Sequence, residues 1–472
     1  MNDEYDLIVL GGGPVGENVA DRAVQGGLTA LIVESELVGG ECSYWACMPS
    51  KALLRSPQVL RAAQNVGGSA EAVTGALDVA AVLRRRDEFT SHWNDDGQVA
   101  WLDSAGIDLV RGHGRLSGER QVTVTTPEGT VRVLTARHAV AISTGSDAAL
   151  PPIPGLAGVD AWTSREATSA EEIPASLVII GGGVVAVEMA TAYASLGSAV
   201  TVLARSGLLG SMEPFAAELV TDGLRELGVD VRTGVATLSV ARDAGLVVVQ
   251  TDSGDVRAAE ILVATGRTPR SNDIGLDTVG LQPGHSIETD DTLRVPGIEW
   301  LYAVGDVNGR VLLTHQGKYQ ARAAGDVIAA RARGGVVDDG KWGRHVATAD
   351  HSAVPQVVFS EPEVAAVGLT ETAARAAGHR VRIVDVEFAS VAGASLHADG
   401  YRGSARMVVD EDQQVLLGMT LVGQDVAELI HAATVAVVGA VPLARLWHAV
   451  PAYPTMSEIW LRLLESYGRD SA

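Results

Sequence analysis

A short apolar stretch followed directly by a glycine-rich turn occurs twice in this chain and constrains its fold more than any other feature. Residues 11–16 read GGGPVG after the apolar residues 7–10, and residues 181–186 read GGGVVA after the apolar residues 177–180. Each turn leads into a segment with helical periodicity and then into a second apolar stretch. This order of strand, turn, helix and strand predicts a Rossmann-like unit, so we expect an α/β protein with two such units.

The first turn is expected to bind a dinucleotide. Its glycines allow backbone N–H groups to approach a pyrophosphate at a helix N-terminus. Glu34 ends the second strand, where a carboxylate can bind a ribose hydroxyl. The residues predicted to contact the ligand are Gly11, Gly13, Gly16, Glu34, Thr144 and Gly145. The alternative is a turn that only packs a helix on a strand.

The second turn differs where the ribose is recognised. Its second strand ends in Leu203-Ala204-Arg205, with no carboxylate that would bind a free 2′-hydroxyl. A guanidinium can bind a 2′-phosphate, so Arg205 favours NADPH, although a solvated surface arginine is the alternative. The residues predicted to contact this ligand are Gly181, Gly183, Ala186, Arg205 and Gly266.

The only two cysteines of the chain, Cys42 and Cys47, follow the first turn closely. An undistorted helix rises about 7.5 Å over five residues, whereas a disulfide needs Cα atoms roughly 4.4 to 6.8 Å apart. A bridge here therefore requires a deformed helix, and strained bridges are easier to reduce. The position predicts a redox-active dithiol beside a flavin; the alternative is two buried, inert thiols.

Length and charge limit the remaining possibilities. The 472 residues predict about three domains. The net charge of −22 argues against nucleic acid or an anionic membrane surface as a partner. The first residues lack the pattern of a secretory signal, and no apolar stretch has membrane-spanning length, so a cytoplasmic protein is expected. In a reducing compartment a lone cysteine pair is more often catalytic than structural. No resident metal is expected.

Together these motifs resemble those of the group I flavoprotein disulfide reductases, the family of dihydrolipoamide dehydrogenase, glutathione reductase and mercuric reductase. Residues 301–306, LYAVGD, resemble the family's second FAD motif, and residues 354–371 resemble the start of its interface domain. The resemblance implies FAD at the first site, with Asp306 at the ribityl chain, NAD(P)H at the second site, and a homodimer. It divides the chain into an FAD domain (1–150 and 273–347), an NAD(P) domain (151–272) and an α+β dimerisation domain (348–472).

The resemblance also implies roles for individual residues. Cys42 would be the interchange thiol that faces substrate, and Cys47 the thiol that contacts the flavin. Lys51 would stand near flavin N5, paired with Glu188; a cation near the ring favours reduced flavin and needs a carboxylate partner when buried. A surface lysine is the alternative for Lys51.

The C-terminal segment departs from the family pattern. Disulfide-reducing members carry a histidine directly before Pro-Thr, oriented by a glutamate five residues later. Here Glu458 is present, but Tyr453 occupies the histidine position. Tyrosine, with a pKa near 10 in solution, is a poor acid-base group for thiol exchange at neutral pH. His448 is a weaker candidate for that role.

A tyrosine at this position makes the chain similar to mercuric reductases. Those enzymes deliver the metal through a C-terminal cysteine pair, which this chain lacks. The bulky Tyr44 and Trp45 between the thiols either pack beneath the flavin or form an apolar face for a quinone-like acceptor.

The sequence therefore predicts an FAD-dependent NAD(P)H oxidoreductase in which hydride passes from NADPH to FAD, then to a Cys42–Cys47 disulfide and on to a small acceptor: a disulfide, a quinone-like compound or a metal ion. Three alternatives remain: a dihydrolipoamide dehydrogenase, a mercuric-type metal reductase, and a flavin-bound redox sensor with negligible turnover.

Overall fold

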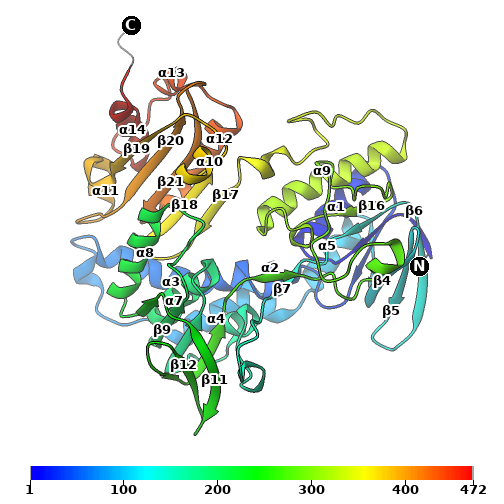
Figure 1. Cartoon of the computed structure of the whole chain (residues 1–472), viewed down its shortest axis with the longest axis horizontal. Helices are drawn as coiled ribbons and strands as arrows, with labels where there is room; N and C mark the ends of the chain where they lie inside the picture. The colour runs from blue at the N-terminus through cyan, green and yellow to red at the C-terminus, as the bar shows by residue number, and fades with distance from the viewer. Residues whose placement is uncertain (1, 470–472) are drawn as a thin grey trace. The chain divides into compact units, whose positions relative to one another are not determined.

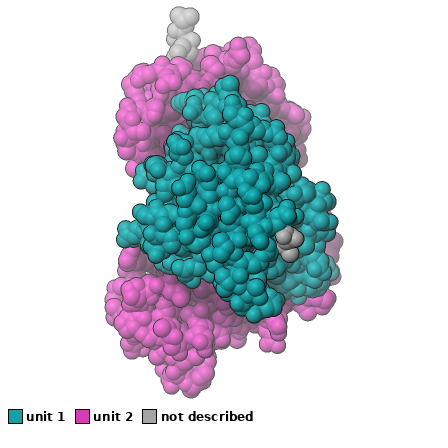
Figure 2. All heavy atoms as spheres, turned by 90° about the vertical axis from the view of Figure 1, so that its right-hand side faces the viewer, with its two compact units in different colours: residues 1–49, 87–149, 267–350 teal, residues 50–86, 150–266, 351–472 magenta. Residues whose placement is uncertain are grey.

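The computed structural model describes residues 2–469. The chain divides into two compact units, shown in different colours in Figure 2. Unit 1 consists of residues 1–49, 87–149 and 267–350, and unit 2 of residues 50–86, 150–266 and 351–472. Each unit is described separately below.

Unit 1 is built on a seven-stranded sheet in the order β3-β2-β1-β6-β5-β4, with β16 also paired to β6. The strands β3, β2, β1, β6 and β16 run parallel, and β4 and β5 are antiparallel. Their bounds are β1 Glu4–Leu10, β2 Ala30–Glu34, β3 Ile107–Arg111, β4 His113–Gly118, β5 Gln121–Thr125, β6 Val131–Ile142 and β16 Leu301–Ala303. Helices α1 (Pro14–Gln25) and α9 (Thr314–Ala332) pack against each other, as Figure 1 shows. The parallel sheet predicted for the first turn is therefore present.

Residues 7–10 of strand β1 are all apolar and buried, as expected for a strand whose two faces are both covered. Leu7 and Val9 lie in a core cluster with α1 and α9, whereas Ile8 and Leu10 lie in a cluster with β5. Successive side chains of a strand point to opposite faces, so one strand joins two cores.

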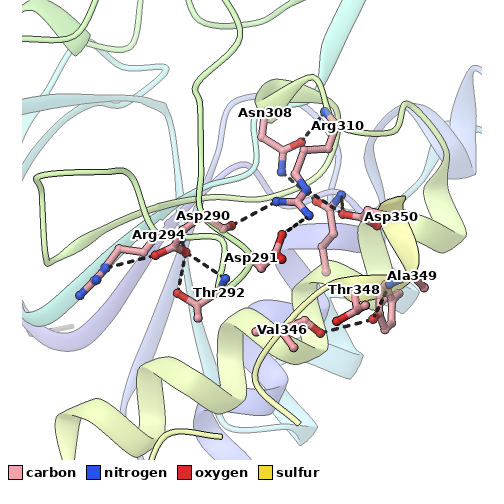
Figure 3. Close-up of polar contacts among 12 residues, drawn as sticks. Asp290, Asp291, Thr292, Arg294, Asn308, Arg310, Val346, Thr348, Ala349 and Asp350 are labelled. Atoms are coloured by element: carbon pink, nitrogen blue, oxygen red, sulfur yellow. Dashed lines mark hydrogen bonds and ion pairs between the residues drawn. The ribbon is translucent and has the colours of Figure 1, made fainter. Parts of the chain in front are cut away.

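A polar network near the end of unit 1 positions the turn after β16 (Figure 3). The guanidinium of Arg310 donates to Asp350 at 2.9 Å and to Asp291 at 2.8 Å. Asp350 also accepts hydrogen bonds from the side chains of Gln316 and Gln320. The Gln320 side chain in turn accepts the backbone N–H of Gly305, the residue before Asp306, at 2.9 Å. The network therefore connects helix α9 to the Asp306 turn.

Residues 176–263 of unit 2 form a smaller Rossmann-like arrangement similar to that of unit 1. A parallel sheet has the order β10-β9-β8-β14, and a separate antiparallel sheet has the order β11-β12-β13. In β8, Leu177 and Ile179 pack in the cluster that contains helix α7, and Val178 and Ile180 pack against the antiparallel strands. The bounds are β8 Ser176–Ile180, α7 Val184–Ser195, β9 Ala199–Ala204, α8 Pro214–Glu226, β10 Asp230–Thr233, β11 Thr237–Asp243, β12 Leu246–Thr251, β13 Val256–Ala258 and β14 Glu260–Val263.

The C-terminal part of unit 2 is an antiparallel sheet of order β17-β18-β21-β20-β19 with helices packed on it. Helices α12 and α14 bury their apolar side chains in the same core cluster as β20 and β21. The bounds are β17 Pro355–Val358, β18 Glu363–Gly368, α10 Glu371–Ala376, β19 Val381–Glu387, α11 Ala392–His397, β20 Ser404–Asp410, β21 Val415–Gly423, α12 Ile430–Val438, α13 Leu443–Leu446 and α14 Ile459–Tyr467. The fold class, two Rossmann-like units and an α+β C-terminal region, is confirmed.

The segment between β2 and β3 is mainly helical. It contains α2 (Gly40–Tyr44), α3 (Cys47–Gln64), α4 (Val79–Phe89) and α5 (Asp96–Ser104). Residues 50–86 of this segment group with unit 2 rather than with the rest of the N-terminal region, so the three-domain boundaries stay a prediction. In the described part of the chain, residues 2–469, no helix combines the length and apolarity needed to cross a membrane.

Candidate active site

A pocket in unit 1 collects many of the residues predicted from sequence. It is lined by the first glycine turn, the end of β2, the thiol segment and the turn after β16. The predicted residues among its lining are Gly11, Gly13, Glu34, Cys42, Thr144, Gly145 and Asp306. Gly16 is not in the lining.

The glycines of the first turn have two different functions in the fold. A Cβ on Gly11 would lie 2.5 Å from the carbonyl oxygen of Ser143, and a Cβ on Gly16 would lie 2.0 Å from that of Gly11. These two glycines allow the backbones of β1, α1 and β6 to approach closely. Around Gly13, by contrast, a Cβ would meet no atom closer than 3.9 Å. Gly13 precedes α1 without a side-chain cap, so the N–H groups of the first turn remain available for an anion.

Two carboxylates lie at separate places in the pocket lining. Glu34 is buried and accepts the backbone N–H of Gly12 at 2.6 Å and that of Glu36 at 2.7 Å. Asp306 accepts the hydroxyl of Ser146 at 2.6 Å. Each carboxylate oxygen can accept a further hydrogen bond, so both are suited to bind sugar or ribityl hydroxyls. With the open space at Gly13 and Cys42 in the lining, these features fit FAD.

The thiols lie where the helix is interrupted. Helix α2 ends at Tyr44, Trp45 leaves helical geometry with φ −136°, and α3 begins at Cys47. The deformation expected from the spacing is therefore present. Both cysteines are thiols, and the Cys47 sulfur lies 3.3 Å from the hydroxyl oxygen of Thr314. The hydrogen bond to Cys47, together with burial, raises the pKa of the Cys42 thiol.

The ion pair expected between Lys51 and Glu188 is present within unit 2. The Lys51 ammonium lies 2.7 Å from the Glu188 carboxylate and 4.8 Å from the centre of the Phe359 ring. The other Glu188 oxygen accepts the backbone N–H of Phe359 at 3.1 Å. Glu188 is buried, and a buried carboxylate needs such partners. Lys51 is thus held by specific contacts, unlike a mobile surface lysine.

The second glycine turn lies wholly in unit 2. A Cβ on Gly181 would lie 2.2 Å from the carbonyl oxygen of Ala264, whereas a Cβ on Gly183 would meet nothing within 4 Å. Ala186 is fully buried in the core, and Gly266 has a left-handed φ of 140°. Arg205 is exposed directly after β9, and among residues 2–469 no hydrogen bond or ion pair holds its guanidinium. It is therefore available to a phosphate.

The structure does not bring Tyr453 and Glu458, the two C-terminal residues predicted from sequence, into contact within this chain. Tyr453 is 77% exposed, and the buried Glu458 accepts the backbone N–H of Gly393 at 3.2 Å. Within the described chain, no hydrogen bond joins Tyr453 to Glu458. His448 is exposed as well. Glu458 thus has no tyrosine to orient here.

The two aromatic residues between the thiols differ. Tyr44 is buried, and its hydroxyl donates to the carbonyl oxygen of Val38 at 3.1 Å. Trp45 is only partly buried, with its ring centre 5.7 Å from that of Tyr44. Tyr44 therefore packs in the core, which leaves Trp45 as the candidate apolar face.

Sequence reasoning missed several polar residues of the pocket lining. Arg267 donates to the hydroxyl of Ser146 at 2.6 Å, and so supports the residue that binds Asp306. Arg270 donates to Glu41, the neighbour of Cys42, at 2.9 Å. Glu41 and Ser146 lie far from Arg267 and Arg270 along the chain, and the only predicted site residue next to either arginine is Gly266. Thr314 begins helix α9, and nothing in its sequence spacing indicates contact with a thiol.

Comparison with known families agrees with this geometry. The family described as pyridine nucleotide-disulphide oxidoreductase matches residues 5–322, and the dimerisation domain of that family matches residues 354–463.

Individual relatives cover nearly the whole chain. A dihydrolipoyl dehydrogenase of Chlorobaculum tepidum is 34% identical over 96% of this chain and 95% of its own length. A mercuric reductase of Shigella flexneri is 32% identical over 98% of this chain and 81% of its own length. Among solved structures, the HOCl-induced flavoprotein disulfide reductase RclA of Escherichia coli has a TM-score of 0.84 and 24% identity, over 98% of this chain and 99% of that chain. This last likeness concerns the fold alone.

Proposed function

Because the chain belongs to the pyridine nucleotide-disulphide oxidoreductase family, and is thus a flavin-dependent NAD(P)H oxidoreductase, we propose that it uses Cys42 and Cys47 as a redox-active disulfide. Bound FAD would accept hydride from the nicotinamide and supply electrons to the disulfide. The observation that carries the proposal is that Cys42 lines the same pocket as Glu34 and Asp306. The thiol chemistry and the dinucleotide contacts thus share one site.

The two thiols have different surroundings, which supports one of them facing the flavin and the other exchanging with the acceptor. Cys47 is next to the hydroxyl of Thr314, a pocket-lining residue, which can donate a hydrogen bond to a thiolate. Cys42 has a raised pKa because it is hydrogen-bonded to Cys47 and buried. Cys47 would therefore be the flavin-facing thiolate and Cys42 the thiol that exchanges with the acceptor. Lys51, oriented by Glu188 and Phe359, would provide the cation near the flavin.

We further propose NADPH as the preferred hydride donor. The exposed guanidinium of Arg205 follows the strand end at Ala204, where the first unit carries the buried Glu34. A carboxylate would repel a 2′-phosphate, and a free guanidinium can bind it with two parallel hydrogen bonds.

The acceptor is proposed to be small: a disulfide, a quinone-like compound or a metal ion. Efficient exchange with a large disulfide needs an oriented acid-base group, and Tyr453 is exposed and not hydrogen-bonded to Glu458. This argues against a dihydrolipoamide dehydrogenase, despite the 34% identical relative. The dimerisation-domain match supports a homodimer, in which Tyr453 would be available to the partner subunit.

An anaerobic titration of the purified flavoprotein with NADPH, and separately with NADH, tests the proposal. Uptake of two electrons with a long-wavelength thiolate-to-flavin band is expected, and Cys47→Ser should abolish the band. A Cys42→Ser variant should keep a thiolate band but lose acceptor turnover. Ser43→Ala, between the two thiols, serves as the matched control. Direct bleaching of the flavin that neither cysteine substitution alters would contradict the proposal and indicate a plain flavin reductase or a sensor.

A further inference from the structure

The short helix that carries Cys42 depends on the rest of unit 1 for its position. Helix α2 has only five residues. At its start, Gly39 and Gly40 take left-handed φ values of 108° and 53°, and after it Trp45 leaves helical geometry. A helix this short is not stable by itself, because its few hydrogen bonds do not offset the cost of starting a helix. Contacts from other elements must therefore fix where Cys42 lies.

The C-terminal end of α2 is held by two contacts of Tyr44. The Tyr44 hydroxyl donates to the carbonyl oxygen of Val38 at 3.1 Å, and the indole N–H of Trp93 donates to the carbonyl oxygen of Tyr44 at 3.1 Å. At the other end, the backbone N–H of Gly39 donates to the carbonyl oxygen of Gly12 at 2.8 Å. This bond lies N-terminal to the rotatable glycine backbone, so it restrains the first turn of α2 only weakly.

The side chain of Glu41 provides a stronger contact for that turn. The Arg270 guanidinium donates to the Glu41 carboxylate at 2.9 Å and to the Asp147 carboxylate at 2.5 Å. It also lies 3.9 Å from the carboxylate of Glu36. The Glu41 and Arg270 side chains are 20% and 30% exposed, so their ion pair is partly shielded from water. Because hydrogen bonds between charged groups are stronger than neutral ones, Arg270 joins α2 firmly to a second element of unit 1.

The main chain around Arg270 is itself fixed. Strand β15 (Arg267–Pro269) ends directly before it and pairs antiparallel with β7 (Ser146–Ala148). The backbone N–H of Arg270 donates to the carbonyl oxygen of Gly145 at 3.0 Å, and the Thr144 hydroxyl donates to the carbonyl oxygen of Arg270 at 2.7 Å. With its backbone held in this way, Arg270 is a suitable anchor for the helix.

We propose that Arg270 is a positioning residue for the thiol pair. By holding Glu41 it fixes α2, and so keeps the Cys42 thiol within reach of Cys47. Glu41 directly precedes Cys42, and both line the same pocket as Arg270. A five-residue helix moves as one body, so a restraint on Glu41 also restrains Cys42. The inference rests on the proposed function and deepens it, because it names a group that sets how readily the disulfide forms.

Removing the anchor should make the disulfide form less readily. Oxidised dithiothreitol converts the two thiols to a disulfide and is itself reduced, so two electrons and two protons pass to it. The equilibrium constant of this exchange rises with the effective concentration of one thiol at the other. We expect about a tenfold lower constant for Arg270→Gln and for Glu41→Gln, which corresponds to a reduction potential about 30 mV less negative. The double variant should lose no more than either single variant, because all three lack the same contact.

The experiment equilibrates the purified flavoprotein anaerobically at neutral pH with mixtures of reduced and oxidised dithiothreitol. After an acid quench and alkylation, mass spectrometry of the peptide that carries both cysteines gives the fraction of disulfide. The matched control is Asp147→Asn, which removes the other carboxylate bound by the same guanidinium and leaves its contact with Glu41. Its constant should stay within about twofold of the parent. Flavin content and thermal unfolding show which variants are folded, and Glu41→Gln decides the question if Arg270→Gln does not fold.

Constants for Arg270→Gln and Glu41→Gln equal to that of the parent would overturn the inference. An equal loss in Asp147→Asn, or additive losses in the double variant, would overturn it as well. The assay contains no pyridine nucleotide. Failure of NADPH-driven reduction would therefore count against the proposed function, whereas equal constants in a protein that does form the disulfide would count against the role of Arg270 alone.

Discussion

The two glycine turns of this protein start from the same architecture and differ at the third glycine position of the motif, which Gly16 occupies in the first turn and Ala186 in the second. In each unit, the strand before the turn packs one face on helices and the other on antiparallel strands. Gly16 in the first turn would place a Cβ 2.0 Å from a carbonyl oxygen, whereas the equivalent Ala186 carries a Cβ that is fully buried without such a clash. Helix α1 therefore lies closer to its own turn than α7 does, and only the first turn strictly needs glycine there.

A second difference lies where each second strand ends. Glu34 ends β2 and is buried, while its counterpart Ala204 ends β9 and is followed by the exposed Arg205. If both glycine turns bind a pyrophosphate as proposed, the residue at the strand end would decide which sugar substituent each unit accepts. The residue after the turn differs as well: Glu17 in the first unit corresponds to the apolar, buried Val187 in the second.

The largest expected effect comes from Gly16→Ala. The new Cβ would collide with the Gly11 carbonyl oxygen, which belongs to the backbone and cannot move aside. We expect a loss of at least about 3 kcal/mol in unfolding free energy, together with loss of bound FAD. Chemical denaturation and the flavin content of the purified protein measure both. The reciprocal Ala186→Gly is the control and should cost only about 1 kcal/mol; equal losses would show that the two turns do not differ as described.

Glu17→Val makes the first turn resemble the second and should stabilise the protein at high pH. The folded-state pKa of Glu17 is raised to about 7 from an ordinary value of 4.5. The folded protein therefore holds this proton more tightly than the unfolded chain, so stability falls as pH rises from 4.5 through 7. Removing the carboxyl should add up to about 3 kcal/mol at pH 8 and little at pH 4.

Thermal and denaturant unfolding of the parent and Glu17→Val at both pH values checks this expectation. Glu119→Gln, an exposed carboxylate in the same unit, is the control and should alter neither curve. A gain that does not depend on pH would indicate better packing rather than relief of a buried charge.

Glu34→Gln should weaken FAD binding by about 2 kcal/mol, close to thirtyfold. Both Glu34 oxygens accept backbone N–H groups, at 2.6 and 2.7 Å, and a glutamine amide would present a donor to one of them. Fluorescence titration of the apoprotein with FAD measures the affinity. Unchanged FAD affinity would remove Glu34 from the list of cofactor contacts.

Arg205→Ala is expected to have the smallest effect. The loss of NADPH binding should be about 1.4 kcal/mol, which corresponds to a tenfold increase in KM for NADPH. KM for NADH should not change. Steady-state reduction kinetics with both nucleotides gives the ratio. Arg225→Ala, an exposed arginine of the same unit, is the matched control. An equal change for both nucleotides would assign Arg205 to general electrostatics instead of phosphate recognition.

Much of the fold was predictable because its signals are local. Apolar residues 7–10 and 177–180, each followed by glycines, indicate buried parallel strands at any position in a chain. The grouping of residues 50–86 with the second unit was not predictable, because it depends on packing between helices and distant strands.

The candidate site shows the same division. Glu34 and the thiols could be identified from spacing, and the pairing of Lys51 with Glu188 from family resemblance. The support of Asp306 by Ser146 and Arg267, and of Gly305 by Gln320, depends on side chains brought together from separate strands and helices.

The sequence by itself determined the chemistry that is available: two glycine turns, a carboxylate after one and an arginine after the other, and a single pair of thiols five residues apart. These are properties of residue type and short spacing, which hold before the chain folds. Only the tertiary structure decided which groups share an environment. The Thr314 hydroxyl lies 3.3 Å from the Cys47 sulfur, and helices α1 and α9 touch because Gly317 and Gly325 carry no Cβ. The ionisation of a buried acid depends on solvation and on nearby charges, and both are set by packing rather than by order along the chain.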